Sequence, residues 1–301
     1  INTIKVELLE KGQTYPPVRK ISLPGEKYNV MRVMESLQLK PDDRRWITQI
    51  PENPEQKDIV YFISCFAHQT PHIINTSLDI LECMGVDFVA IGGVDFCCGE
   101  MDLSVGNCQA SDNLARNLVH AIEAFQPQKA VFLCGGCYNR FVNYLPLFID
   151  FNFGVELLIQ FYFENIDKIN FTKPLDLKAT YHDSCAIGRR SGFYETPRAL
   201  IKKIPGVEVV DMENCRGNSS CCGGMNLITN PQVANSMGKE LGKQVKLTGV
   251  NNVITSCLGC DFTLSQIGCA YDFSAENFIS LLGRAMGIEH EDKLALYRSY
   301  K

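Results

Sequence analysis

The sequence predicts an α/β protein made of two repeated halves, each with a parallel sheet. Three observations carry this prediction. A pattern of five cysteines occurs twice in register, with corresponding cysteines 120 to 124 residues apart. Continuous apolar segments alternate with amphipathic helical segments along both halves. In each half, two of the apolar segments end on a cysteine of the pattern.

Each copy of the cysteine pattern consists of a single cysteine, a Cys-Cys-Gly step and a C-x-x-C pair. The two copies are Cys65, Cys97, Cys98, Cys134 and Cys137, and Cys185, Cys221, Cys222, Cys257 and Cys260. Two adjacent cysteines cannot readily close a disulfide on each other without strain. The doublets therefore need another reason to exist, and a five-thiol pattern that occurs twice indicates two metal-cluster sites in two related halves.

From residue 58 onward, strands and helices follow the same order in both halves. Strands are predicted at 58–64, 86–91, 129–134, 178–185, 207–212 and 252–257, and helices at 77–83, 110–125, 195–204 and 232–247. Continuous apolar strands that alternate with helices predict parallel sheets covered on both faces, in two Rossmann-like halves. Because sites in such sheets form beyond the carboxyl ends of the strands, each half would gather its five thiols at one edge.

The first 57 residues contain no cysteine and are expected to form a small N-terminal extension. A strand is predicted at 4–8, a second at 21–23, a short helix at 29–37 and a proline-rich link at 51–58. The expected domains are the extension at 1–57, a first cysteine-rich domain at 58–170 and a second at 171–301. The extension is either a packing element or a docking element for a partner subunit.

The most apolar stretch, 141–163, is interrupted by Pro146 and Asp150. Such interruptions argue against a membrane span. We expect a buried strand followed by a helix in this stretch. A surface that faces a partner, such as a membrane subunit, is the alternative.

Composition and charge limit the classes of function. The chain has 301 residues, of which 46% are hydrophobic and 21% charged, as in an ordinary soluble protein with a substantial core. A formal net charge of −5 gives no support to nucleic acid as the main partner, since a basic stripe would be expected. Residues 1–9 lack the apolar segment of a secretory signal, so we expect a reducing cytoplasm. There the fourteen cysteines indicate metal binding rather than disulfides.

Five thiols at this spacing favour an iron–sulfur cluster. A C-x-x-C step lets two thiolates approach a metal from a turn and the start of a helix. Glycines in and beside the cysteine motifs let the backbone approach a bulky group closely. Structural zinc needs four ligands, and an adjacent doublet with a distant single cysteine is awkward around one tetrahedral ion. A cluster of several irons fits better, while zinc and thiols without metal remain alternatives.

These residues carry a family resemblance. Both copies of the C…CCG…CxxC pattern, with YHDSC (181–185) and NSSCCGG (218–224), resemble the CCG-domain cysteine-rich proteins, in particular the B-type component of heterodisulfide reductase. The resemblance covers 58 to about 287. It implies that each copy binds a non-cubane [4Fe-4S] cluster through its five cysteines, and that paired one-electron steps at the two clusters reduce or form a disulfide. It implies no flavin or nucleotide bound by this chain.

The resemblance also bears on partners. The motif C-x-x-C-x-x-C-x-x-x-C-P of membrane-type relatives is absent from these residues, so electrons are expected from a ferredoxin-like C-type subunit and a flavoprotein A-type subunit of a heterodisulfide-reductase-like complex. The implied substrate is a small disulfide, a thiol or protein-bound sulfur, and any contact with a membrane would be indirect. Ser64 stands where relatives often have glycine. Other relatives serve in lactate, glycolate or glycerol-phosphate oxidation, so a non-catalytic electron-transfer or docking subunit of a flavin dehydrogenase complex is the alternative.

Two histidines are the candidate catalytic residues. His68 follows Cys65 by three positions, and His182 precedes Cys185 by three. Either imidazole could donate a proton or a hydrogen bond to a cluster sulfur. The alternative is a strand-end histidine that hydrogen-bonds the backbone.

Other side chains near the second pattern have two interpretations each. Asp183 and Ser184 are expected to orient a turn or to cap a helix. Arg189 and Arg190 either meet an anionic substrate or lie on an exposed helix face. Among the four remaining cysteines, Cys83 and Cys269 are expected in the core, whereas Cys108 and Cys215 are candidates for contact with a cluster or for a reactive thiol.

Overall fold

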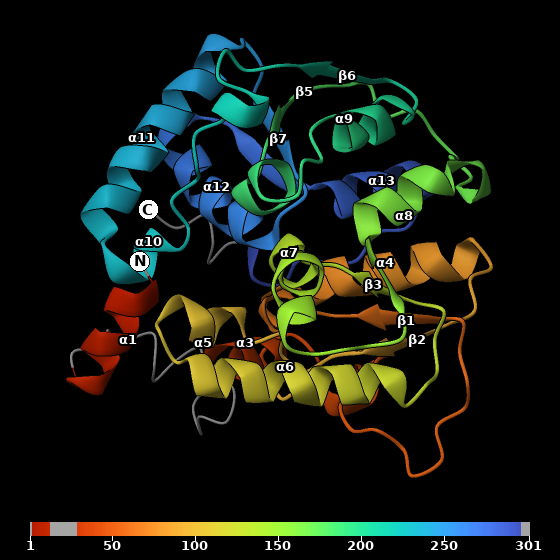
Figure 1. The fold of residues 1–301 in the computed structure, drawn as a ribbon. Helices are drawn as coiled ribbons and strands as arrows, with labels where there is room; N and C mark the ends of the chain where they lie inside the picture. The colour runs from red at the N-terminus through yellow and green to blue at the C-terminus, as the bar shows by residue number, and fades with distance from the viewer. Residues whose placement is uncertain (1, 13–28, 296–301) are drawn as a thin grey trace. The chain divides into compact units, whose positions relative to one another are not determined.

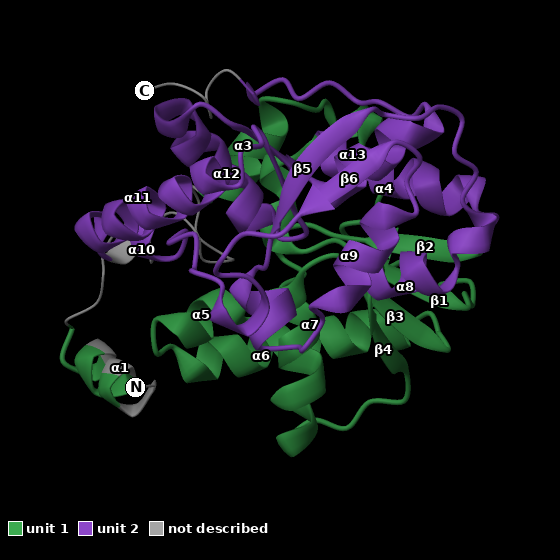
Figure 2. Cartoon of the chain, turned by 90° about the horizontal axis from the view of Figure 1, so that it is seen from above, with its two compact units in different colours: residues 1–71, 86–158 green, residues 72–85, 159–301 purple. Residues whose placement is uncertain are grey.

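The computed structural model describes residues 2–12 and 29–295, and Figure 1 shows their helices and strands. The strands of these described residues form two four-stranded sheets. The chain groups into two compact units: unit 1 contains 1–71 and 86–158, and unit 2 contains 72–85 and 159–301 (Figure 2). The chain therefore crosses from one unit to the other three times.

The sheet of unit 1 is entirely parallel. Its strands are β1 (Ile59–Phe62), β2 (Phe88–Ile91), β3 (Lys129–Phe132) and β4 (Gly154–Leu157), in the order β2-β1-β3-β4. Three successive residues of β1, Val60, Tyr61 and Phe62, are completely buried, so both faces of this strand are covered. The strand order reverses between β1 and β3, and such a switch point is where open α/β sheets form ligand sites.

Unit 1 also contains helices and short 3₁₀ turns. They are α1 (Asn2–Glu10), α3 (Val30–Ser36), α5 (Glu100–Ser104), α6 (Cys108–Glu123) and α7 (Gly135–Asn143), with 3₁₀ turns η1 (Pro41–Asp43), η2 (Cys65–Gln69) and η3 (Leu145–Leu147). Helix α6 has a strongly amphipathic sequence and places Leu118 and Ile122 in one core cluster with Val60 and Phe132. Burial of these side chains is the main reason for the helix to pack there, at about 25 cal/mol per Å² of apolar surface removed from water.

The sheet of unit 2 repeats the topology of the first. Its parallel strands are β5 (Leu177–His182), β6 (Val207–Val210), β7 (Asn252–Thr255) and β8 (Ser274–Asn277), in the order β6-β5-β7-β8. The helical elements of this unit are α4 (Pro71–Cys83), α8 (Leu158–Glu164), η4 (Ile166–Lys168), η5 (Cys185–Arg189), α9 (Glu195–Lys202), η6 (Arg216–Asn218), α10 (Asn226–Thr229), α11 (Pro231–Leu247), α12 (Leu258–Tyr271) and α13 (Phe278–Met286). Leu241 and Val245 of α11 pack with Val253 of β7 and Leu264 of α12.

Helix α4 follows β1 in the chain but, apart from Pro71, belongs to unit 2. The hydroxyl of Tyr162 donates to the carbonyl oxygen of Ser77 at 3.1 Å, and His290 contacts Asp79 at 2.6 Å. At Gly283 of α13, a Cβ would lie 2.4 Å from a methyl of Thr76, so only glycine fits there. The repeat in sequence is therefore not a repeat in packing, because the first half contributes a helix to the second unit.

The predicted fold class is confirmed. Every predicted strand from residue 58 onward and every predicted helix of the two halves is present. The bounds agree within three residues, except that the helix expected at 77–83 begins at Pro71. The stretch 141–163 contains β4 and α8, the expected strand and helix. The fourth strands, β4 and β8, extend both sheets. Among the described residues, no helix is long and apolar enough to cross a membrane.

The extension differs from its prediction at one place. The strand expected at 4–8 is wrong, because these residues lie in helix α1. Ile4 and Leu8 are four residues apart and therefore share one face of a helix. A helix also satisfies its backbone hydrogen bonds without a partner strand. The expected helix at 29–37 is present as α3, and the strand expected at 21–23 lies outside the described residues. The division into 1–57, 58–170 and 171–301 stays a prediction.

Candidate metal centres

The central strands of each sheet end at the thiols. Cys65 follows β1 and Cys134 follows β3, so these two cysteines lie on either side of the switch point of the first sheet. Cys185 and Cys257 follow β5 and β7 in the same way. The carboxyl ends of neighbouring parallel strands meet at one edge, and the thiols of each half therefore come together there.

The five thiols of the first half form one continuous group. The sulfurs of Cys65 and Cys97 are 3.6 Å apart. Cys97 also contacts Cys98, Cys98 contacts Cys137, and Cys137 contacts Cys134. All five cysteines predicted for this half are thus brought together.

The second half repeats this order of contacts. Cys185 contacts Cys221, and Cys221 contacts its neighbour Cys222. The sulfurs of Cys222 and Cys260 are 3.3 Å apart, and Cys260 contacts Cys257. The two halves therefore present the same five-thiol arrangement.

The glycine after each doublet has a local structural reason. Gly99 and Gly223 have φ values of 78° and 85°, in the left-handed region that favours glycine. A Cβ on Gly99 would lie 2.3 Å from the carbonyl oxygen of Ser111 in α6. The N–H of each glycine points at the first sulfur of its doublet, at 3.4 Å from Cys97 and from Cys221. Close approach to a cluster was the expected reason for these glycines, whereas Gly99 is required by close approach to a helix.

Each C-x-x-C pair spans the start of a helix. Cys134 is the N-cap residue of α7, and Cys257 is the N-cap residue of α12. The second cysteine of each pair, Cys137 or Cys260, lies in the first turn. The first N–H groups of a helix have no partner within the helix and stabilise negative charge. This position suits thiolates that bind a metal.

In the absence of a cation, contacts among the thiols oppose the ionisation of the second cysteine of each C-x-x-C pair. Hydrogen bonds with Cys134 and Cys98, together with burial, raise the pKa of the Cys137 thiol well above its usual value. Hydrogen bonds with Cys222 and Cys257 and burial do the same to the pKa of Cys260. A bound metal reverses this effect, because a coordinating thiol is deprotonated outright. The donor set therefore fits a cationic group with several metal atoms.

Arg140 connects the doublet loop of the first half to two helices. It lies in α7 three residues after Cys137 and is 1% exposed. Its Nε donates to the carbonyl oxygen of Cys98 at 2.5 Å, and its Nη2 donates to Ser111 Oγ at 2.7 Å and to Asp112 at 3.2 Å. Arg140 was not among the residues predicted from the sequence. Its spacing from the C-x-x-C pair, which places it on the same helix, was the available signal.

A charge network holds the loop of Cys185 in the second half. The buried carboxylate of Asp183 accepts two hydrogen bonds of 2.7 Å from Arg198 and one of 2.7 Å from the backbone N–H of Arg216. Asp211 also accepts a hydrogen bond from Arg198, at 2.7 Å. Ser184 accepts from the N–H of Ile187 and caps the turn that begins at Cys185. These contacts agree with the loop-orienting interpretation of Asp183 and Ser184.

His182 faces the thiols of the second half. The side chain is 1% exposed, and neither ring nitrogen has a hydrogen-bond partner among the described residues. A ring nitrogen and the sulfurs of Cys222 and Cys260 all lie within 4.8 Å of one another. Burial lowers the pKa of His182 to about 4, so the ring is neutral at physiological pH. The structure thus adds a sixth polar side chain to this thiol group.

His68 lies in a different environment. Its Nε2 accepts a hydrogen bond of 2.8 Å from the N–H of Gly93, and its Nδ1 contacts Glu35. The ring also packs against Trp46, with centroids 5.6 Å apart. Helix α3 and the residues after it therefore pack on the turn that contains Cys65, as the packing interpretation of the extension expects for this part. Both ring nitrogens have partners that are not thiols, and a catalytic role for His68 stays an untested prediction.

The cysteines outside the two thiol groups, and Arg189, lie in environments that differ in part from those expected. Cys83 is exposed rather than in the core, because it is the last residue of α4. Cys269 is only half-buried, and its thiol contacts the carbonyl oxygen of Ser265 at 3.3 Å. Cys108 begins α6, and Cys215 lies 3.2 Å from the guanidinium of Arg216. Arg189 holds the loop before the second doublet by donating to the carbonyl oxygen of Ser219 at 2.6 Å.

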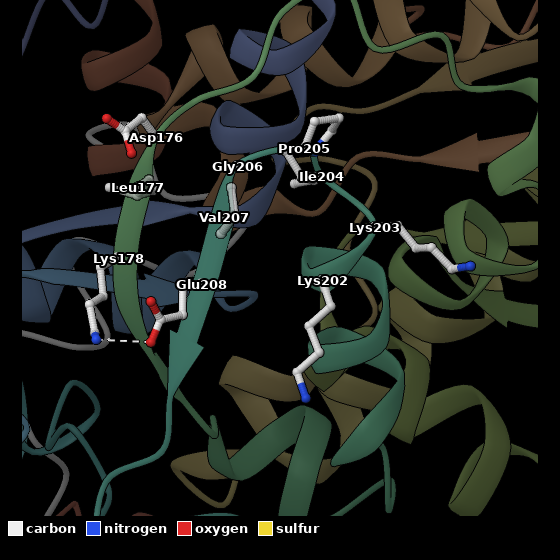
Figure 3. A pocket seen from close by; sticks show the side chains of 10 residues that line it. All are labelled: Asp176, Leu177, Lys178, Lys202, Lys203, Ile204, Pro205, Gly206, Val207 and Glu208. Atoms are coloured by element: carbon white, nitrogen blue, oxygen red, sulfur yellow. Dashed lines mark ion pairs between the residues drawn. The ribbon is translucent and has the colours of Figure 1, made fainter.

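A pocket in unit 2 lies at the wrong end of its sheet to be the thiol site. Figure 3 shows side chains around the amino ends of β5 and β6, among them Lys178, Lys202 and Glu208. Lys178 and Glu208 form an ion pair of 2.9 Å across the two strands. The thiols lie beyond the opposite, carboxyl ends of the strands, and no cysteine lines this pocket.

Comparison with solved structures shows the fold. The chain is similar to a hypothetical protein from Helicobacter pylori, with a TM-score of 0.58 and 12% sequence identity, over 91% of this chain and 57% of that one. At this identity the likeness concerns the fold alone.

Comparison with curated proteins gives closer relatives. The chain is 30% identical to the D-type component of dihydromethanophenazine:CoB–CoM heterodisulfide reductase of Methanosarcina barkeri, over 82% of this chain and 63% of that protein. It is 28% identical to the B-type component of fumarate reductase (CoM/CoB) of Methanothermobacter marburgensis, over 80% and 48%. It is 27% identical to EtfAB:quinone oxidoreductase of Syntrophomonas wolfei, over 60% and 26%. The chain thus spans less than two thirds of the length of each of these relatives.

The family model for the CCG cysteine-rich domain matches residues 59–141 and 179–265, more than half of the chain. The two matched ranges contain the two thiol groups described above, one each. The chain therefore belongs to the family of CCG cysteine-rich domain proteins and carries two copies of the domain.

Proposed function

We propose that the chain is the iron–sulfur subunit of an electron-transfer complex similar to heterodisulfide reductase, with one [4Fe-4S] cluster in each thiol group. The observation that carries this proposal is the repeated five-thiol arrangement, with the same order of contacts at the same edge of both sheets. Cys65, Cys97, Cys98, Cys134 and Cys137 would hold one cluster, and Cys185, Cys221, Cys222, Cys257 and Cys260 the other.

The donor set favours iron over zinc. A structural zinc ion takes four ligands in a tetrahedron, but each group offers five soft sulfur donors in mutual contact. Each doublet supplies two adjacent donors that suit a group with several irons; Cys97, Cys98 and Cys222 are buried and Cys221 is half-buried. The non-cubane form of the clusters rests on the resemblance to heterodisulfide reductase.

The proposed reaction is the reduction of a disulfide or its reverse. Splitting the S–S bond consumes two electrons and two protons and yields two thiols. The two clusters, when bound, supply one electron each and a Lewis-acidic iron for each emerging thiolate. The chain itself holds the ligands in place through Arg140 in one half and through Asp183 and Arg198 in the other. His182 lies against the second thiol group, where its neutral ring offers one N–H donor.

The proposed substrate and partners follow from the relatives. Their names specify a CoB–CoM heterodisulfide or a reaction with CoM and CoB, so a small disulfide or thiol is the substrate class that we propose. Electrons would come from a ferredoxin-type donor and a flavoprotein that act together with this chain.

Metal analysis of anaerobically purified protein tests the cofactor. We expect about eight irons and about eight acid-labile sulfides per chain, as two four-iron clusters require. Protein that contains mostly zinc, or about four irons, would contradict the proposal. Reduced protein is then mixed with candidate disulfides, and thiol release with a new EPR signal of a cluster is the expected result.

A second candidate function is electron transfer without substrate chemistry. The similarity to EtfAB:quinone oxidoreductase favours it, because that name describes an electron-transfer reaction with no disulfide. In this case a partner would carry out the chemistry. The same experiment separates the two candidates, since no disulfide would then change the EPR signal of either cluster.

A further inference from the structure

The two thiol groups differ in the side chains that face them from the central strands. Three positions before the first cysteine, the first half has Phe62 and the second has His182. Two positions before the C-x-x-C pair, the first half has Phe132 and the second has Thr255. These residues are cross-strand partners, Phe62 with Phe132 and His182 with Thr255. An aromatic pair in one half is therefore replaced by a polar pair in the other.

We propose that the ring N–H of His182 donates a hydrogen bond to a sulfur of the second cluster and raises the reduction potential of this cluster above that of the first. The inference rests on the proposed function, because it requires a cluster in each thiol group. It assigns a positioning and potential-setting role to His182, with Phe62 as its apolar counterpart.

The position of the His182 ring requires a partner. The ring is buried and neither nitrogen is hydrogen-bonded among the described residues. A buried polar group that lacks a hydrogen bond is unfavourable, and native structures rarely leave one unpaired. At the corresponding position, Phe62 fills the same register without any polar atom. Packing alone therefore does not explain an imidazole here.

The polar neighbours of His182 have other partners. The hydroxyl of Thr255 accepts a hydrogen bond of 3.4 Å from the backbone N–H of Cys257. Tyr181 and Ser256 are hydrogen-bonded to each other at 2.5 Å. The sulfurs of Cys222 and Cys260 lie within 4.8 Å of a ring nitrogen. A cluster held by these thiols would place sulfur next to the ring and would provide the missing acceptor.

The direction of the effect follows from charge. Reduction makes an iron–sulfur cluster more negative, and a hydrogen bond to its sulfur stabilises the more negative state. Hydrogen bonding to the sulfurs is one of the factors that set the potential of such clusters. In the first half, the packed rings of Phe62 and Phe132, with centroids 5.6 Å apart, offer no donor. The second cluster should therefore accept an electron first.

A reciprocal exchange of the two residues tests the proposal. Wild-type protein, His182→Phe and Phe62→His are titrated with reductant under anaerobic conditions, and the EPR signals of the clusters are followed against potential. We expect two separate steps in the wild type. His182→Phe should shift only the higher step to lower potential, and Phe62→His should shift only the lower step upward. His182→Gln, which keeps an N–H donor, should retain most of the wild-type separation.

Electron–nuclear double-resonance spectroscopy gives a second readout, and its first signals come from the wild type alone. We expect a proton that exchanges in D₂O and is coupled to one cluster, and a weak coupling to a histidine nitrogen that disappears in His182→Phe. The proposal would be overturned if the potentials of both reduction steps were unchanged in both variants. The strong nitrogen coupling of a direct iron–nitrogen bond would also overturn it. Iron-free wild-type protein would overturn the proposed function with it, whereas eight irons with unshifted steps would overturn the role of His182 alone.

Discussion

In the first half, Cys65 is buried and begins the turn η2, against which helix α3 packs, whereas in the second half Cys185 is exposed. The order of contacts among the five thiols is nevertheless the same in both halves. The extension before residue 58 accounts for the difference, because Glu35 and Trp46 contact His68 in unit 1. A common ligand arrangement can thus be kept while the access to it is changed by an added segment.

The two halves also secure their ligand loops by different means. In the first, Arg140 of the C-x-x-C helix reaches the carbonyl oxygen of Cys98. The corresponding residue of the second half is Thr263, which bonds only within its own helix. The second half instead holds the loop of Cys185 through Asp183 and Arg198. The two repeats therefore share the ligand cysteines but differ in the residues that hold the ligand loops in place.

The largest expected effect is the loss of one cluster, in one half at a time, when a ligand cysteine is replaced. Cys98→Ser should lose the first cluster and Cys222→Ser the second, because each removes a buried donor from the centre of its thiol group. Each variant should keep roughly half of the iron, about four atoms per chain. Iron and sulfide analysis with EPR provides the measurement. Cys83→Ser, at an exposed cysteine outside both groups, is the matched control and should keep all the iron. Full iron in either doublet variant would contradict the ligand assignment.

The charge network of the second half should give the largest change in stability. Arg198→Leu leaves the carboxylate of Asp183 buried without its partner, and such a loss costs about 3–5 kcal/mol in the free energy of unfolding. Chemical denaturation of the metal-free chain measures it. Counted from the first cysteine of each pattern, the positions of Asp183 and Arg198 correspond to Ile63 and Leu78 in the first half.

The double variant Asp183→Ile/Arg198→Leu copies these apolar residues and serves as the control. It should be less destabilised than Arg198→Leu alone, because it leaves no uncompensated buried charge. A double variant that is less stable than the single variant would show that the network contributes more than a buried pair.

A third difference between the halves should appear as a pH dependence. Asp102 follows the first doublet by four positions, and Asn226 follows the second by four. Burial raises the pKa of Asp102 to about 6. In the unfolded chain this carboxyl group ionises at lower pH, so it does not penalise folding below pH 3.8. The penalty grows as pH rises from 3.8 to 6 and is complete above that range.

Asp102→Asn copies the second half and should remove this penalty. Above pH 6 the variant should be more stable than the wild type by at most about 3 kcal/mol, and near pH 3.8 the two should be equal. Denaturation at a series of pH values checks this expectation. Equal stability of the two proteins at pH 7 would show that Asp102 carries no such penalty.

The sequence was sufficient to predict the ligand cysteines but not the residues that hold their loops in place. The thiols could be predicted to meet because Cys65 and Cys134 each follow an apolar strand, and parallel strands end at one edge. Edge strand β8 was missed because its residues, Ser274–Asn277, lack an apolar run. The contacts of Arg140 depend on tertiary packing between α6 and α7, which no local pattern encodes. The assignment of α4 to unit 2 has the same origin, since an apolar helix face does not specify its partner.

The last and smallest expected effect concerns the access to the thiols. In the metal-free chain, hydrogen bonds from Cys185 and Cys222 lower the pKa of Cys221. The pair of exposed Cys185 and half-buried Cys221 therefore contains a thiolate at neutral pH. Its counterparts Cys65 and Cys97 are buried, and the hydrogen bond with Cys65 raises the pKa of Cys97.

Because the thiolate is the nucleophile, limiting iodoacetamide should modify the second pair roughly tenfold faster than the first. Peptide mapping by mass spectrometry measures the two rates, and exposed Cys83 serves as an internal reference for an accessible thiol. Glu35→Ala, which removes the contact between α3 and His68, should increase modification of Cys65 and leave that of Cys185 unchanged. Equal rates for the two pairs in the wild type would mean that the extension does not protect the first thiol group, and the difference between the halves would then lie only in the residues that support the ligand loops.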